Sequence, residues 1–108
     1  MMYRIMLACA GGMSTSLLAT SMRKAGDEMG IEMTVAAMPV GNVAAVREDI
    51  DILLIGPQVR YQIEQVKKIY QELPVTVQVI DSLDYGRMLG EKVLKQALET
   101  YKLERGRD

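Results

Sequence analysis

Short apolar segments alternate with longer amphipathic stretches along the chain, and this alternation constrains the fold more than any other feature. Four segments read as strands, and three read as helices in which apolar side chains recur at helical spacing. The expected strands are 3–8, 31–37, 51–55 and 75–80, the expected helices are 14–29, 59–73 and 89–101, and a weaker pattern at 39–48 predicts a short helix. A repeating order of strand and helix is typical of a parallel sheet with helices on both faces. We therefore expect an α/β fold with three layers.

Composition and charge narrow the class of protein. The 108 residues are 49% hydrophobic and 25% charged, which fits one globular domain spanning 1–108. The net charge of −1 gives no electrostatic reason to expect nucleic-acid binding. With no histidine and one cysteine, we expect no metal site. The apolar run at the N-terminus is too short for a signal peptide or a membrane span, so we expect a cytoplasmic protein.

Three loops that follow predicted strands contain residues suited to a functional site. They are 9–15, 56–58 and 81–86, and the loop after the second strand borders them. In a parallel sheet, ligands bind beyond the carboxyl ends of the strands, where neighbouring connections diverge to opposite faces. We therefore expect these loops to lie together.

The only cysteine, Cys9, ends the first predicted strand and opens a glycine- and hydroxyl-rich turn. The two glycines let the backbone curl closely around a ligand, and successive N–H groups in such a curl form an anion site. The helix that follows adds N–H donors and the positive end of its dipole. The predicted phosphate-binding residues are Ala10, Gly11, Gly12, Met13, Ser14, Thr15 and Ser16. The same field favours a thiolate, placed for in-line attack on phosphorus, which would give a phosphocysteine.

Other interpretations of Cys9 stay open from the residues alone. A lone cysteine is often a small buried hydrophobe. A cysteine phosphatase or a related arsenate reductase would use the same loop, but it needs an arginine six residues after the cysteine, where this chain has Thr15. Without that guanidinium the loop can hold a phosphoryl group but stabilises its hydrolysis poorly. A phosphate-sensing module that forms no covalent adduct is a further alternative.

Three motifs resemble one known family. CAGGMSTSLL, LLIGPQVRY and VIDSLDYG, in this order and spacing, are similar to the enzyme IIB components of the lactose/cellobiose (β-glucoside/chitobiose) type of the bacterial phosphoenolpyruvate-dependent sugar phosphotransferase system. The resemblance covers about residues 3–103. It implies a four-stranded parallel sheet of order 2-1-3-4, as in low-molecular-weight tyrosine phosphatases.

The resemblance also implies a phosphotransferase function. Cys9 would accept a phosphoryl group from a phosphohistidine of enzyme IIA and donate it to a sugar, such as cellobiose, lactose or chitobiose, held by the membrane transporter enzyme IIC. The protein would then be cytoplasmic and bound to the inner face of the membrane through IIC. Ala10, Met13 and Leu17 are candidate contacts for IIA. One departure is Ala10, since the family often has Ser or Asn after the cysteine.

Residues outside the cysteine loop are weaker candidates. Gln58 and Tyr85 are possible supporting residues that offer an amide and a hydroxyl to phosphate or to a partner. Asp81 and Asp84 resemble the acid loop of a phosphatase, but without the arginine we do not assign them that role. The lysines at 67, 68, 92 and 95 are expected to be solvated helix faces.

Overall fold

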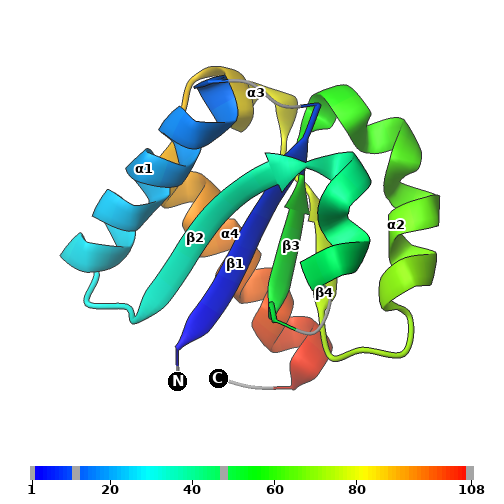
Figure 1. Ribbon diagram of the computed structural model, residues 1–108. Helices are drawn as coiled ribbons and strands as arrows, with labels where there is room; N and C mark the ends of the chain where they lie inside the picture. Colours follow the sequence, from blue (N-terminus) through cyan, green and yellow to red (C-terminus); the bar gives the residue numbers. More distant parts are fainter. Residues whose placement is uncertain (1, 11–12, 47–48, 107–108) are drawn as a thin grey trace.

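A computed structural model describes residues 2–10, 13–46 and 49–106 and contains a four-stranded parallel sheet between two layers of helices (Figure 1). The strands are β1 (Tyr3–Cys9), β2 (Met33–Pro39), β3 (Ile52–Ile55) and β4 (Thr76–Val79). The α-helices are α1 (Met13–Glu28), α2 (Ile63–Tyr70), α3 (Ser82–Gly86) and α4 (Gly90–Arg105), with 3-10 helices η1 (Val40–Val46) and η2 (Pro57–Gln62). The sheet order is β2-β1-β3-β4, which confirms the predicted order 2-1-3-4 and the α/β class.

Two hydrophobic clusters lie on opposite faces of the sheet. One joins the sheet to α1 and α4, and the other joins it to α2 and η1 (Figure 1). β3 supplies both, since Ile52 and Leu54 belong to the first cluster and Leu53 and Ile55 to the second. All four side chains are at most 2% exposed. This explains the continuous apolar run, because a strand covered on both faces needs no polar alternation.

The element boundaries differ from the predictions mainly in two places. The stretch predicted as one helix over 59–73 is η2 followed by α2, which ends at Tyr70 rather than at the proline beyond it. The loop predicted at 81–86 contains the short helix α3. Asp81 caps this helix, since its Oδ1 accepts hydrogen bonds from the backbone N–H groups of Leu83 at 2.9 Å and Asp84 at 3.1 Å.

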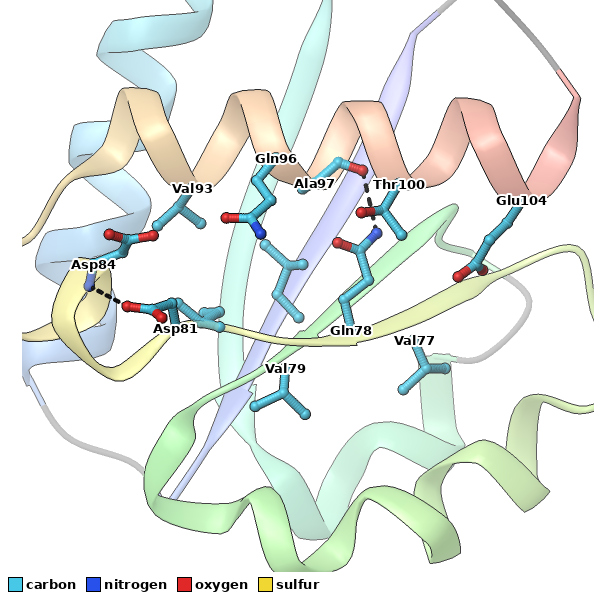
Figure 2. A pocket seen from close by; sticks show the side chains of 12 residues that line it. Val77, Gln78, Val79, Asp81, Asp84, Val93, Gln96, Ala97, Thr100 and Glu104 are labelled. Carbon is cyan, nitrogen blue, oxygen red and sulfur yellow. Dashed lines mark hydrogen bonds between the residues drawn. The ribbon is translucent and has the colours of Figure 1, made fainter.

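A buried ion pair ties α3 to α4. The side chain of Asp84 is only 2% exposed, and its Oδ1 lies 2.9 Å from the Nζ of Lys92. The hydrogen bond that the Lys92 ammonium donates to Asp84, together with the negative charge of this carboxylate, raises the pKa of Lys92 above the ordinary 10.5. Lys92 and Lys95 are both exposed, as expected of a solvated helix face, but each forms an ion pair, Lys92 with Asp84 and Lys95 with Glu91. Figure 2 shows Asp84 and its hydrogen bond to Asp81 beside α4.

The contact between α1 and α4 depends on Gly90 and gives the first prediction. A Cβ at this position would lie 2.6 Å from the backbone carbonyl carbon of Ser21 and 2.7 Å from the backbone nitrogen of Met22, and neither can move independently of α1. We expect Gly90→Ala to lower the free energy of unfolding by about 1–3 kcal/mol, measured by urea denaturation. The matched control is Gly86→Ala, where no atom lies within 4 Å of the added methyl group. Equal stability of the two variants would contradict this packing.

The second prediction concerns the Asp84–Lys92 pair. Lys92→Met leaves a buried carboxylate without its cation, so we expect a lower Tm by circular dichroism. Adding Asp84→Asn to Lys92→Met should recover part of the loss. Because the pKa of Lys92 is raised by folding, this stabilisation is complete below pH 10.5 and is lost as the pH rises through the folded value. A Lys92→Met protein as stable as the parent at pH 7 would exclude a stabilising pair.

Candidate functional site

Cys9 is the last residue of β1, at the centre of the carboxyl edge of the sheet. It pairs with Pro39 of β2, and the residue before it, Ala8, pairs with Ile55 of β3. The cysteine is 2% exposed. Although it is buried, it belongs to neither hydrophobic cluster of the described residues. Burial of this kind is also found for a cysteine that fills a core, so the polar contacts of the sulfur are what distinguish Cys9.

A chain of buried hydroxyl groups adjoins the sulfur. Cys9 Sγ is hydrogen-bonded to Thr15 Oγ1, which in turn lies 2.9 Å from the hydroxyl of Tyr85. The same hydroxyl lies 3.1 Å from Ser14 Oγ. Thr15 is 2% exposed and Tyr85 5% exposed, so these hydrogen bonds lie largely away from water. The chain joins β1 and the neighbouring α1 to α3, since Thr15 and Tyr85 are 70 residues apart in the sequence.

The turn after β3 closes the other side of the cysteine. Gly56 donates a backbone hydrogen bond to the carbonyl oxygen of Ala8 at 2.8 Å. A Cβ on Gly56 would lie 3.0 Å from the Cβ of Cys9 and 3.0 Å from the Oε1 of Gln58. A side chain at position 56 would therefore press on both groups. Glycine lets the β3 turn approach Cys9 and brings the Gln58 amide to the same place.

A shallow groove of about 280 Å³ runs between η2 and α3 beside this cluster. Its lining residues are Pro57, Gln58, Arg60, Ser82, Tyr85 and Gly86. It thus contains both supporting residues predicted from the sequence, and it adds Arg60, which the sequence analysis did not single out. The sequence did contain a signal for Arg60, because this residue lies in the second motif, LLIGPQVRY, on the segment that follows a strand.

A separate hollow of about 210 Å³ lies between β4 and α4 (Figure 2). Its lining includes Asp81 and Asp84, but not Cys9 or the hydroxyl groups around it. The two carboxylates are already engaged, Asp81 as the cap of α3 and Asp84 with Lys92. Neither is presented to Cys9 as the general acid of a phosphatase would be.

The predicted phosphate-binding residues divide into three groups. Gly11 and Gly12 lie outside the described residues. Ala10 is an exposed bend residue, and Met13 to Ser16 form the first turn of α1, which is longer than predicted by one residue at this end. The first turn of an α-helix presents N–H groups that have no acceptor within the helix. Ser14 and Ser16 are exposed, whereas the Thr15 hydroxyl is turned inward to the sulfur.

The three loops predicted to cluster do lie together. Hydrogen bonds between the Tyr85 hydroxyl and the hydroxyls of Ser14 and Thr15 join the loop 81–86 to the start of α1. The close approach of Gly56 to Cys9 joins the loop 56–58 to the end of β1. The cluster offers a sulfur nucleophile, hydroxyl groups and the N-terminal turn of a helix. Thr15 occupies the position at which a cysteine phosphatase needs its arginine. The arrangement therefore suits the holding of a phosphoryl group better than its hydrolysis.

Among residues 2–10, 13–46 and 49–106, no group of three or more potential metal-ligating side chains comes together. Within the same residues, no helix combines the length and the apolar character that crossing a membrane requires.

Known proteins match the chain over nearly its whole length. The family model described as "PTS system, Lactose/Cellobiose specific IIB subunit" matches residues 4–96. An oligo-beta-mannoside-specific EIIB component of Bacillus subtilis (strain 168) is 36% identical over 97 residues, which cover 90% of this chain and 94% of that protein. A galactose-specific EIIB component of Lactococcus lactis subsp. cremoris is 40% identical over 98 residues, which cover 86% and 91%.

Structural comparison agrees with the fold. The lactose-specific IIB component domain from Streptococcus pneumoniae superposes with a TM-score of 0.83 at 19% identity, covering 92% of this chain and 97% of that one.

A more distant relative in sequence is a lactose-specific EIICB component of Staphylococcus epidermidis. It is 26% identical over 93 residues, which cover 84% of this chain and 16% of that protein. The phosphatase and phosphate-sensing alternatives are not favoured. The chain belongs to the lactose/cellobiose-specific IIB subunits of the phosphotransferase system, and it is a phosphotransferase component that acts in phosphoryl transfer to sugar.

Proposed function

We propose that Cys9 is the atom through which this IIB subunit carries the phosphoryl group. The observation that supports this role is the hydrogen bond between the Cys9 sulfur and Thr15, at the carboxyl edge of the sheet and outside both hydrophobic clusters. The first turn of α1 directs N–H groups and the positive end of the helix dipole toward this edge. A sulfur so placed meets both needs of a carrier, a nucleophile and an anion site beside it.

The transfer proceeds in two displacements. The Cys9 sulfur attacks the phosphorus of a phosphohistidine on enzyme IIA, so that an S–P bond forms as the N–P bond breaks. The electron pair of the broken N–P bond stays on the imidazole nitrogen. This nitrogen takes up one proton, which balances the proton that the Cys9 thiol loses. A sugar hydroxyl oxygen then attacks phosphorus and the S–P bond breaks. The sugar hydroxyl loses its proton in this step, and uptake of one proton by the sulfur restores the Cys9 thiol.

The phosphocysteine needs donors that offset roughly two negative charges. Backbone N–H groups of residues 10–16 are the proposed donors, with the hydroxyl groups of Ser14, Thr15 and Ser16. Tyr85 supports this set because it holds the Ser14 and Thr15 hydroxyls in one arrangement. Gln58 is a second supporting residue, since its amide oxygen lies at the β3 turn that touches Cys9.

The partners follow from the two displacements. Enzyme IIA supplies the phosphohistidine, and the membrane transporter IIC holds the sugar. The Staphylococcus relative is named as an EIICB component, which favours a IIC partner for the IIB unit of this chain as well. We propose that residues 1–108 act as one IIB domain in the cytoplasm, bound to the inner membrane face through IIC.

Contacts with IIA should surround the cysteine. Leu17, on α1, is 55% exposed, and Ala10 is exposed beside Cys9. Apolar side chains left in water next to a reactive group suit a transient protein interface. Met13 is the third proposed contact. The sugar is proposed to be of the cellobiose, lactose or chitobiose kind, and its choice rests with IIC.

The third prediction tests the carrier role. The protein would be incubated with phosphoenolpyruvate, the general phosphotransferase proteins and a IIA of the lactose/cellobiose type. Intact-protein mass spectrometry should then show the gain of one phosphoryl group, on the peptide that contains Cys9. Cys9→Ser should abolish sugar phosphorylation and leave the circular dichroism spectrum unchanged. Normal sugar phosphorylation by Cys9→Ser would refute the proposal.

The fourth prediction concerns the hydroxyl of Tyr85. Tyr85→Phe removes the partner of Thr15 and Ser14, so we expect a loss of about 1–3 kcal/mol in stability and phosphoryl transfer slower by roughly tenfold. The matched control is Tyr70→Phe, which also removes a buried hydroxyl hydrogen bond, here 2.8 Å to the carbonyl oxygen of Val43. The control should lose similar stability but keep the transfer rate in single-turnover measurements. Equal rates for both variants would limit Tyr85 to a role in folding.

A further inference from the structure

Charge is distributed unevenly between the edge that holds Cys9 and the rest of the chain. The segments that follow β1 and β2, residues 10–15 and 40–46, contain no charged residue. The segment after β3, residues 56–62, contains only Arg60. The segment after β4, residues 80–89, contains two aspartates and Arg87. This edge therefore has few charges in a protein whose net charge is −1.

Both aspartates at this edge already have hydrogen-bond or ion-pair partners, and neither lines the groove between η2 and α3. Asp81 accepts hydrogen bonds from two backbone N–H groups of α3, at 2.9 and 3.1 Å. Asp84 is 2% exposed and lies 2.9 Å from the Lys92 ammonium. Among the described residues, neither carboxylate forms an ion pair with an arginine. The residues that line the groove include an arginine and no carboxylate, so the charge of the lining is positive.

Arg60 and Arg87 are the arginines of the segments that follow β3 and β4. Both are exposed, and among the described residues neither forms an ion pair. Arg87 is the residue that ends α3, and it does not line the groove between η2 and α3. Arg60 lines the groove between η2 and α3, together with Gln58 and Tyr85. Of the two arginines, Arg60 is the one whose groove shares residues with the surroundings of Cys9.

The approach of Gly56 connects this groove to the cysteine. A Cβ atom at position 56 would lie 3.0 Å from both the Cys9 Cβ and the Gln58 Oε1, so all three residues are close together. Gln58 also lines the groove, two residues before Arg60. On the other wall, Tyr85 lines the groove and reaches Thr15 with its hydroxyl. A ligand lying in the groove would therefore contact the arginine together with two residues that adjoin the surroundings of Cys9.

We infer that Arg60 makes this groove an electropositive docking surface for the phosphorylated form of the donor protein. This inference rests on the proposed function, in which the donor carries a phosphohistidine. A phosphoryl group brings roughly two negative charges to the interface, and an uncompensated guanidinium is the complementary group. Charges at the rim of an interface act chiefly on the rate of association and on its salt dependence. Arg60 thus distinguishes the phosphorylated donor from the unphosphorylated one.

The test is the fifth prediction and compares two charge reversals of equal size. Arg60→Glu changes the groove, whereas Lys68→Glu makes the same change in net charge on the exposed surface of α2. Both are made in a Cys9→Ser protein, so that binding is measured without transfer. Association with a phosphorylated lactose/cellobiose-type IIA would be followed by surface plasmon resonance at 50 and 500 mM salt. The unphosphorylated IIA is measured in parallel.

We expect Arg60→Glu to slow association with phosphorylated IIA by about tenfold at low salt, and the difference to shrink at high salt. Lys68→Glu should change the rate by less than about twofold. Arg60→Met, which keeps the apolar stem, should give a smaller loss of roughly threefold. Equal losses for Arg60→Glu and Lys68→Glu, or equal losses with phosphorylated and unphosphorylated IIA, would overturn the inference. These experiments measure binding and not transfer. They therefore test the role of Arg60 even if the mass spectra show that Cys9 is not the carrier.

Discussion

The central position of β1 and β3 is the constraint on which the site depends. These two strands pair in parallel, and the connections that leave them go to opposite faces of the sheet (Figure 1). The chain after β1 enters α1, which packs with α4, whereas the chain after β3 enters η2 and α2, which pack on the other face. Divergence of this kind opens a crevice at the carboxyl edge, between the two strand ends. Cys9 and Gly56 are the residues at that crevice, so the topology itself puts the sulfur where a ligand can be held.

Polar contacts then fix the orientations of side chains, which packing in the hydrophobic clusters leaves undetermined. Burial of the strands and helices aligns the loops, but it gives no preferred orientation to a hydroxyl or a thiol. The hydrogen bonds of Thr15 to Cys9 and Tyr85 provide that orientation across three elements. Tyr85 depends in turn on α3, a five-residue helix too short to be stable alone. The Asp81 cap and the Asp84–Lys92 pair are what hold that helix against α4.

Most of the fold was predictable from the sequence because its main signals are local. β3 was evident as a continuous apolar run, and the helices that cover the sheet were evident from the spacing of residues such as Leu18 and Val93. α3 was missed because its capping residue resembles a turn signal and its five residues are too few to show a helical period. The role of Lys92 was missed for a different reason, since its partner lies eight residues earlier across a turn. Such a pair depends on the meeting of two helices, which no local pattern reports.

The same cluster distinguishes a carrier from a hydrolase on physical grounds. Hydrolysis of a phosphocysteine requires a water to attack and an increase of charge on the phosphoryl oxygens to be stabilised, for which a phosphatase uses a guanidinium in its loop. Here the equivalent position is Thr15, whose hydroxyl is committed to the sulfur and to Tyr85. The carboxylates that would assist a leaving group are held by α3 and Lys92. In the proposed carrier role, donors that bind a ground-state phosphoryl group without favouring attack by water would keep the S–P bond intact until a better-placed nucleophile arrives. The positive charge of Arg60 lies in the adjoining groove rather than in the loop, and in the proposed docking it would favour the arrival of a phosphorylated partner without promoting loss of the group to water.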